Sequence, residues 1–293
     1  MMQKLFPPDY PPVDSRTNTP IPSDSLRAPV QARFNHIFTV MLLLISISLI
    51  ILMTGADLAL EHLIFNPNHQ WPGQGKPPWS TLYTVGPLPG LILGGTALVC
   101  GVLGTFISCL KKFRKPAVFL VLLLIVGPGL ITNVILKDHV GRPRPQELKT
   151  FGGEYQFVQF WTPGPGKKNS SFPSGHASIA FYMMAPWFIF RKKSRTIALF
   201  SLNTGLLFGF LVGAARIMQG AHFLSDIVWA GGLVYIVAEV LSWYCLDDFN
   251  ISFLNPTFSR TYPAVDARQH TCSGRELSEP ALTCKYPVTR QIP

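Results

Sequence analysis

The stretch IFTVMLLLISISLIILMTGA, from Ile37 to Ala56, contains no charged side chain. A helix needs about 20 consecutive apolar residues to cross the hydrocarbon core of a bilayer, so this stretch predicts a membrane-spanning helix. The composition agrees with a membrane protein, because 48% of the residues are hydrophobic and only 14% are charged. Typical soluble domains carry about 25% charged residues.

Five further apolar segments have a similar length, and together they predict an all-α integral membrane bundle of six transmembrane helices. The fourth is short, and Gly127-Pro128-Gly129 predicts a kink in the third. The six predicted spans are Ile37–Ala56, Gly86–Leu110, Pro116–Leu136, Pro173–Phe190, Thr196–Ala215 and Ser225–Leu246.

The two ends of the chain have a different composition from the bundle. Residues 1–35 are polar and rich in proline, which is typical of a disordered tail. Residues 36–247 form the predicted membrane domain, and residues 248–293 are expected to be a flexible tail without a motif.

Two short basic links, KKFRK at Lys111–Lys115 and RKKSR at Arg191–Arg195, predict the orientation. Cytoplasmic loops carry an excess of Lys and Arg, so both links and both tails are expected in the cytoplasm. The loop 137–172 is then outside, and its cations are assigned to ligand binding. The formal charge of +10 is attributed to topology and anionic headgroups, and no nucleic-acid partner is expected.

The first motif, KDHVGRPRP at Lys137–Pro145, closes the third span. Its cations Lys137, Arg142 and Arg144, with Arg216 further along, can surround a phosphoryl group, because arginine offers a planar fork to phosphate oxygens and lysine a point charge. The alternative is a basic loop at the membrane surface.

The second motif, PSGH at Pro173–His176, opens the fourth span and reads as a helix start. Proline suits the first helical position, and the N–H groups of Ser174 and Gly175 would then point at an anion. His176 could give a proton to a leaving oxygen. The alternative is a turn with an interfacial histidine.

The third motif, RIMQGAHFLSD at Arg216–Asp226, joins the fifth and sixth spans. Four residues separate His222 and Asp226, which places them on one face of a helix. The carboxylate could accept the Nδ1 proton and leave Nε2 free to attack phosphorus. The alternative is a satisfied interfacial pair. Glu239, deeper in the sixth span, is expected to pack or to form hydrogen bonds.

The three motifs resemble those of the type 2 phosphatidic acid phosphatase family, which are K-x6-RP, PSGH and SR-x5-H-x3-D. The resemblance covers residues 116–246 and departs at one position, where Ala215 replaces the family's serine before Arg216. That serine is a minor phosphate contact in the family, so the change affects fine positioning.

The resemblance implies a two-step reaction. His222 attacks phosphorus to form a phosphohistidine, oriented by Asp226, while His176 protonates the leaving group and later activates water. Opposite starting protonation of the two histidines predicts a bell-shaped pH profile. No metal or cofactor is implied, since cations stand in for a metal. The implied phosphate-binding residues are Lys137, Arg144, Ser174, Gly175 and Arg216.

The leading functional prediction is a metal-independent lipid phosphatase whose active site lies at the outer face of the membrane. Candidate substrates are phosphatidic acid, phosphatidylglycerol phosphate, undecaprenyl pyrophosphate and lipid A; the stretch Phe151–Phe157 is faintly similar to bacterial lipid A phosphatases. The expected location is a bacterial inner membrane with the site facing the periplasm, or an extracellular or lumenal face in a eukaryote. The alternatives are a lipid phosphotransferase and a non-catalytic anion transporter or lipid-binding protein.

Overall fold

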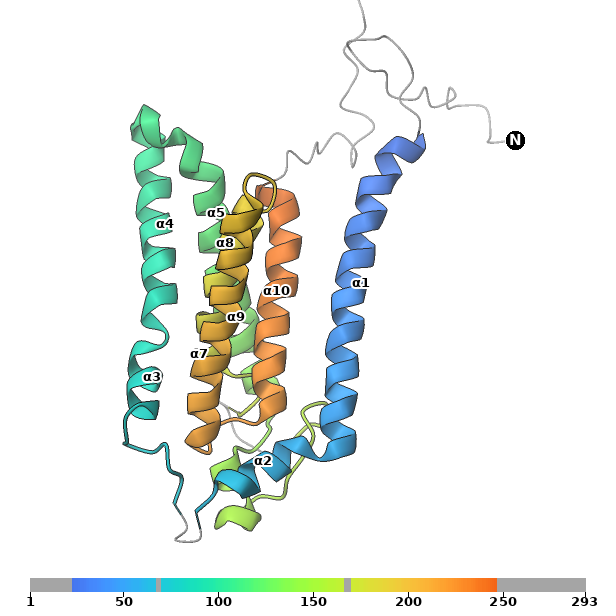
Figure 1. The fold of residues 1–293 in the computed structure, drawn as a ribbon, viewed down its shortest axis with the longest axis vertical. Helices are drawn as coiled ribbons and strands as arrows, with labels where there is room; N and C mark the ends of the chain where they lie inside the picture. Colours follow the sequence, from blue (N-terminus) through green and yellow to red (C-terminus); the bar gives the residue numbers. More distant parts are fainter. Residues whose placement is uncertain (1–22, 67–69, 166–169, 247–293) are drawn as a thin grey trace, which may run out of the picture. The chain divides into compact units, whose positions relative to one another are not determined.

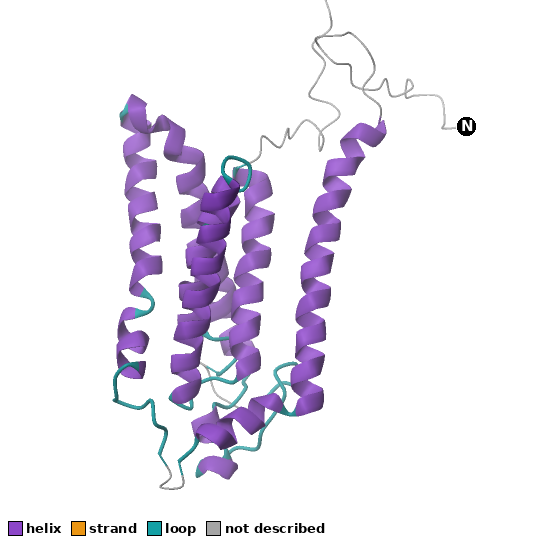
Figure 2. Cartoon of the chain, in the orientation of Figure 1, coloured by secondary structure: helices purple, strands orange, loops and turns teal. Residues whose placement is uncertain are grey.

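The structure is a computed structural model that describes residues 23–66, 70–165 and 170–246. The chain divides into two units, Met1–Phe249 and Asn250–Pro293. The second unit and the predicted tail 248–293 lie outside the described residues, as do residues 1–22. Every regular element in the described part of the chain is helical (Figure 2), so the predicted all-α class is confirmed.

Five helical segments are long and apolar enough to cross a membrane, which makes the chain a multi-pass membrane protein. They coincide with five of the six predicted spans. Their bounds are Gln31–Thr54, Trp79–Phe106, Ser108–His139, Arg195–Met218 and Leu224–Cys245.

The first span belongs to a longer helix than the sequence predicts. Helix α1 runs from Ser23 to Thr54, so residues 23–35, which were expected in a disordered tail, are helical. Extending an existing helix is easier than nucleating one, and the apolar span supplies the nucleus. The helix ends at Thr54 and is followed by Gly55, whose φ of 63° is open to glycine at little steric cost. The chain then continues as α2, Ala56–Ile64.

The second and third spans are each built from more than one element. The third changes to π-helical geometry at Ile125, just before Gly127-Pro128-Gly129, and the predicted kink at this position stays a prediction. The Asn133 amide donates to the Pro128 carbonyl at 2.7 Å. The elements are α3 (Trp79–Val85), α4 (Leu88–Phe106), η1 (Ser108–Phe113), α5 (Arg114–Leu124), η2 (Ile125–Leu136) and α6 (Lys137–His139).

The fourth predicted span is the one that does not form a single long helix. It consists of α7 (Gly175–Phe181), η5 (Tyr182–Met184) and α8 (Pro186–Phe190). Pro186 explains the interruption, because proline has no N–H and its ring clashes with the carbonyl four residues earlier. The stretch lies against α9, and Phe181 and Met184 are fully buried. Six spans are therefore not confirmed.

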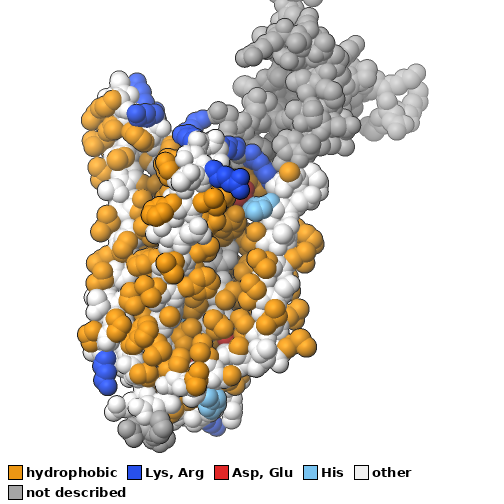
Figure 3. Space-filling view, in the orientation of Figure 1, with side chains coloured by type: hydrophobic (Ala, Val, Ile, Leu, Met, Phe, Trp, Pro, Cys, Tyr) orange, Lys and Arg blue, Asp and Glu red, His pale blue; other side chains and the backbone are white. Residues whose placement is uncertain are grey.

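Helices α9 (Arg195–Met218) and α10 (Leu224–Cys245) complete the bundle, and the short turns η3 (Pro145–Glu147) and η4 (Lys149–Phe151) lie in the loop before α7. The α4–α5 link and the end of α8 lie at one end of the bundle (Figure 1), where Lys and Arg side chains gather (Figure 3).

Near that end Glu239 accepts hydrogen bonds from Arg191 at 2.6 and 3.1 Å and from Trp243 at 2.9 Å. Its predicted hydrogen-bonding role is confirmed.

Candidate active site

The three motifs meet at the opposite end of the bundle from the α4–α5 link (Figure 1). The first follows η2, the second opens α7, and the third joins α9 to α10. Arg144 and Arg216 both act electrostatically on the rings of His176 and His222. The structure thus brings the two histidines and these two guanidinium groups into one neighbourhood.

The ring of His222 is held by a backbone carbonyl. Its Nδ1 lies 2.7 Å from the Ser171 carbonyl oxygen and 3.6 Å from Oδ2 of Asp226. A carbonyl oxygen can only accept, so Nδ1 carries the proton and Nε2 of the neutral ring keeps its lone pair. Helix α10 begins only at Leu224, so His222 does not share a helical face with Asp226 as the sequence predicted. Ser171, outside the three motifs, sets the tautomer.

Burial keeps His222 neutral. The side chain is 1% exposed, and this loss of hydration lowers the pKa of His222 to about 4, although the carboxylate of Asp226 acts in the opposite direction. An unprotonated Nε2 is the form that can attack phosphorus.

Asp226 is fixed from several directions. Its Oδ2 accepts from the backbone N–H of Phe223 at 2.9 Å and, in a very short hydrogen bond, from the Ser171 hydroxyl. Its Oδ1 pairs closely with Arg142. Because Ser171 contacts both Asp226 through its hydroxyl and His222 through its carbonyl, the carboxylate positions the histidine largely through Ser171.

Arg142 does not belong to the phosphate site, contrary to the prediction that it can surround a phosphoryl group. Its side chain is 0% exposed. Nη1 pairs with Asp226 and donates to the Ser225 hydroxyl at 2.8 Å, Nη2 pairs with Asp57 at 2.8 Å, and Nε donates to the Val158 carbonyl at 3.1 Å. The planar fork of arginine suits this bridge between two buried carboxylates.

Two acidic residues of α2 were missed by the sequence reasoning. Asp57 accepts from the Ser225 N–H at 2.9 Å and the Ser225 hydroxyl at 2.6 Å, in addition to Arg142. Glu61 is 0% exposed, and neither carboxyl oxygen has a hydrogen-bond partner among the described residues. Burial, with Asp226 and Asp57 nearby, raises the pKa of Glu61 to about 9. An acidic residue directly after an apolar span was the available signal, since it is costly there without a partner.

The start of α7 differs in detail from the sequence prediction. Ser174 is the N-cap and accepts from the Ala177 N–H at 3.4 Å, which leaves Pro173 outside the helix rather than at its first position. The N–H of Ser174 donates to the Asp226 carbonyl at 3.3 Å, so it does not point at an anion as predicted. His176 is the second residue of the helix.

Gly175 is required by a close neighbour. A Cβ at this position would lie 2.2 Å from Oδ1 of Asn133 in η2, which is closer than any real contact. The absence of a side chain therefore lets the start of α7 pack against the π-helical segment. The predicted role of Gly175 in binding phosphate stays a prediction.

Tyr83 of α3 links the two sides of the site, and no motif indicated it. Its ring stacks on His176 with centroids 4.6 Å apart, and the Arg216 guanidinium carbon lies 4.5 Å from the same ring centroid. Lys137 and Arg144 also lie within electrostatic range of His176. The histidine is therefore next to three cations.

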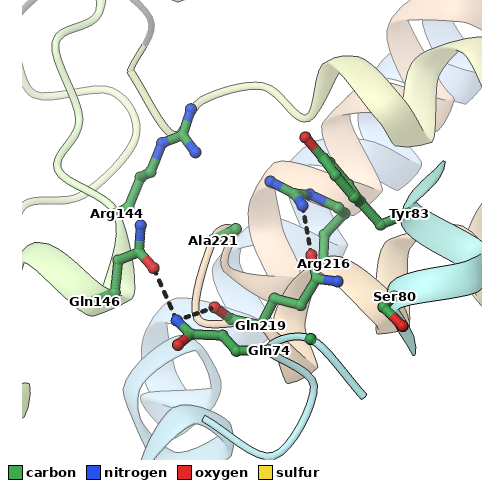
Figure 4. A pocket seen from close by; sticks show the side chains of 9 residues that line it. Gln74, Ser80, Tyr83, Arg144, Gln146, Arg216, Gln219 and Ala221 are labelled. Carbon is green, nitrogen blue, oxygen red and sulfur yellow. Dashed lines mark hydrogen bonds between the residues drawn. The ribbon is translucent and has the colours of Figure 1, made fainter. Parts of the chain in front are cut away.

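A cavity of about 380 Å³ opens beside this cluster and is lined in part by Arg144, Arg216 and Gln219 (Figure 4). Nη1 of Arg216 donates to Oε1 of Gln219. Nε of Arg216 is buried and has no hydrogen-bond partner in the described part of the chain. Such a donor is costly unless a ligand satisfies it, and an anion would do so.

Residues 116–251 match the model of the PAP2 superfamily. The chain is similar to proteins called lipid A 4'-phosphatase: one from Francisella tularensis subsp. novicida (strain U112) is 39% identical over 133 residues, 44% of this chain and 58% of that protein. One from Rhizobium etli is 39% identical over 118 residues, 39% of this chain and 45% of that protein. The chain thus spans about half the length of these curated relatives.

Among solved structures, the chain resembles the crystal structure of a transmembrane PAP2 type phosphatidylglycerolphosphate phosphatase from Bacillus subtilis. The TM-score is 0.47 at 18% sequence identity, over 71% of this chain and 94% of that one.

Proposed function

Because residues 116–251 match the model of the PAP2 superfamily, we propose that the chain belongs to this superfamily and is a membrane phosphatase that hydrolyses a phosphate monoester of a lipid. The relatives named lipid A 4'-phosphatase make lipid A the first substrate to test. The supporting observation is the state of His222. Its Nδ1 is held by a carbonyl at 2.7 Å, its Nε2 is left with a lone pair, and Arg144 and Arg216 lie in range.

In the proposed first step, Nε2 of His222 attacks phosphorus and the bond from phosphorus to the ester oxygen breaks. The leaving oxygen takes a proton from His176, and the covalent product is a phosphohistidine. Arg144, Arg216 and Lys137 offset the charge that grows on the phosphoryl oxygens, which is usually the largest electrostatic contribution to such catalysis.

In the second step a water molecule attacks the phosphohistidine and gives its proton to His176. The bond between phosphorus and Nε2 breaks, and inorganic phosphate leaves. Asp226 acts as a positioning residue, because its oxygens bind Ser171, Phe223 and Arg142 rather than substrate. No step of the proposed reaction uses a metal or a cofactor.

The proposed topology has six crossings: the five long helical segments and the stretch formed by α7, η5 and α8, which is the fourth crossing in chain order. The active site faces outward. Residues Gly175–Phe190 would span about 24 Å as helix, at 1.5 Å for each residue, which approaches the hydrocarbon thickness of about 30 Å. The short basic links lie at the opposite end and would be cytoplasmic. In a bacterium this topology puts the site in the periplasm.

Phosphate release by the purified full-length protein in detergent tests the function. We expect release from at least one member of a panel containing lipid A, phosphatidic acid, phosphatidylglycerol phosphate and undecaprenyl pyrophosphate. His222→Ala should lose this activity and still give a monodisperse, folded protein. Vanadate, which mimics five-coordinate phosphorus, should inhibit the parent protein. Appreciable release by the His222 variant would rule out this nucleophile.

The transferase alternative differs only in the acceptor. Added lipid alcohols would then receive the phosphoryl group from the phosphohistidine, and inorganic phosphate would not accumulate. Quantifying phosphate and phosphorylated lipid in the same reaction separates the two outcomes.

A further inference from the structure

The cavity beside the proposed phosphate site has a second wall of neutral polar groups. Among the described residues that line it, Arg144 and Arg216 are the cations, and Gln74, Gln146 and Gln219 supply amides (Figure 4). A phosphate bound by the two arginines would leave these amides facing the group that carries the phosphate. Its volume of about 380 Å³ lies within the range of small-molecule sites.

The three amides form a connected set drawn from three parts of the chain. Nε2 of Gln74 donates to Oε1 of Gln146 at 3.2 Å and to the Gln219 carbonyl at 3.4 Å. Gln219 is 8% exposed and fixed at both ends, accepting from Arg216 and donating to the Trp79 carbonyl at 3.3 Å. The amide wall is therefore tied directly to a proposed phosphate ligand.

Backbone hydrogen bonds hold the wall in place. The N–H of Gly73 donates to the Met218 carbonyl, and the N–H of Gln146 donates to the Gly220 carbonyl, both at 2.9 Å. The loops that carry Gln74 and Gln146 are thus anchored to the end of α9. Preorganised polar groups lose little entropy when a ligand binds.

The wall keeps hydrogen-bonding capacity for a ligand. Oε1 of Gln74 and Nε2 of Gln146 have no hydrogen-bond partner within the described ranges, and the Ser80 hydroxyl that lines the same cavity has none there either. The set offers both an acceptor and donors. Its complement is a headgroup with several hydroxyl or amide groups, each of which donates and accepts.

We propose that Gln74 and Gln146 form a specificity subsite for the sugar of a sugar phosphate, next to the phosphate site. The inference rests on the proposed function and narrows it to lipids whose phosphate is attached to a carbohydrate. A pyrophosphate would bring a second anion to a wall whose described side chains carry no cation, and a diacylglycerol backbone would offer these exposed amides fewer hydrogen-bonding groups than a sugar does.

Full-length protein in one detergent tests the subsite with two probes, lipid A, whose phosphates are attached to sugar, and phosphatidic acid. The double variant Gln74→Ala, Gln146→Ala should lower kcat/KM for lipid A by about tenfold, the loss expected for one to two hydrogen bonds. Its kcat/KM for phosphatidic acid should change less than about twofold. Gln156→Ala removes an exposed glutamine outside the cavity lining and is the matched control.

An equal loss on both lipids, or no loss on either, overturns the subsite while leaving the phosphatase proposal intact. A parent protein that acts on phosphatidic acid but not on lipid A also overturns it. Release of phosphate from no lipid at all would remove the proposed function and the subsite together.

Soluble headgroups separate sugar recognition from lipid presentation. N-Acetylglucosamine 4-phosphate should compete with substrate more strongly than glycerol 3-phosphate, which has the same charged group. The glutamine double variant should lose that preference. Equal inhibition by both compounds in the parent protein contradicts the inference.

Discussion

At the scale of a single residue, the protonation of His222 decides whether the site can react. The ring donates from Nδ1 to a carbonyl at 2.7 Å, so attack by Nε2 requires the neutral form. Burial lowers the pKa of His222 to about 4, which keeps that form populated well into the acid range. Protonation of His222 should therefore set the acid limb of the pH profile.

We expect the acid limb of kcat/KM to fall as pH decreases through about 4, not through the ordinary histidine value of 6.5. Burial and the neighbouring cations lower the pKa of His176 to about 4 as well, so the alkaline limb of kcat/KM, which the bell-shaped prediction assigns to loss of the His176 proton, should begin just above the acid limb. The measurement is initial rate against pH in detergent with a stable lipid phosphate. An acid limb centred near 6.5 would show that a less buried group controls the reaction.

Glu61 gives a prediction about stability. Its pKa is raised from 4.5 to about 9, so folding takes up a proton between those values and the free energy of unfolding decreases as pH rises. Glu61→Gln removes this ionisation and keeps the shape of the side chain. The variant should gain thermal stability relative to the parent as pH rises from about 5 to 9.

Thermal unfolding in detergent at several pH values measures this difference. Glu154→Gln is the matched control, because Glu154 is exposed and its replacement should give no comparable trend. A stability difference between Glu61→Gln and the parent that stays constant with pH would contradict the raised pKa.

At the scale of elements, Arg142 ties α2 to the start of α10. It bridges Asp57 and Asp226 while completely buried. Arg144, two residues later, is partly exposed and lines the cavity. The two arginines of GRPRP therefore have different tasks, which matched substitutions can separate.

Arg142→Lys should destabilise the fold, since one ammonium group cannot bridge both carboxylates and breaking a buried pair costs about 3–5 kcal/mol. It should also lower kcat, because Asp226 positions Ser171 and His222. Arg144→Lys should leave the melting temperature close to the parent value and raise KM. Melting curves and steady-state kinetics on both variants test the contrast, and equal destabilisation would refute it.

Sequence reasoning located most elements but not their internal construction. Five spans followed from apolar length alone, and the three motifs were placed at span ends where the structure has them. The division of the fourth span depends on Pro186 within a buried, tightly packed stretch. Spacing also could not show that Ser171 holds His222, because that contact joins segments 51 residues apart.

Contacts across the fold account for the residues that sequence reasoning missed. Tyr83 lies far along the chain from the motifs and reaches the site only because α3 packs against α9. The sequence context of Arg142 indicated phosphate binding, yet its guanidinium group forms an ion pair with Asp57 of α2. Such pairings depend on which helix ends become neighbours, and a single sequence does not encode them in any local pattern.

At the scale of the whole membrane domain, the number of crossings decides on which side the site lies. His176 and Arg191 stand at opposite ends of the α7–η5–α8 stretch. If this stretch crosses the bilayer, both basic links lie on one side and the site lies on the other. If it does not cross, the link after α8 shares a side with the first two motifs, and the third motif, at the far end of α9, lies on the other side, which would divide the site.

Single cysteines introduced into a cysteine-free background distinguish these topologies through labelling by a membrane-impermeant thiol reagent. Lys112→Cys, Lys193→Cys and Thr150→Cys all replace exposed residues, and the last lies in η4 beside the site. With six crossings, Lys112→Cys and Lys193→Cys should react only in inside-out vesicles, and Thr150→Cys only in right-side-out vesicles. Labelling of Lys193→Cys from the same side as Thr150→Cys would mean that α7, η5 and α8 re-enter the membrane without crossing it. Reversal of all three would keep six crossings and put the site in the cytoplasm.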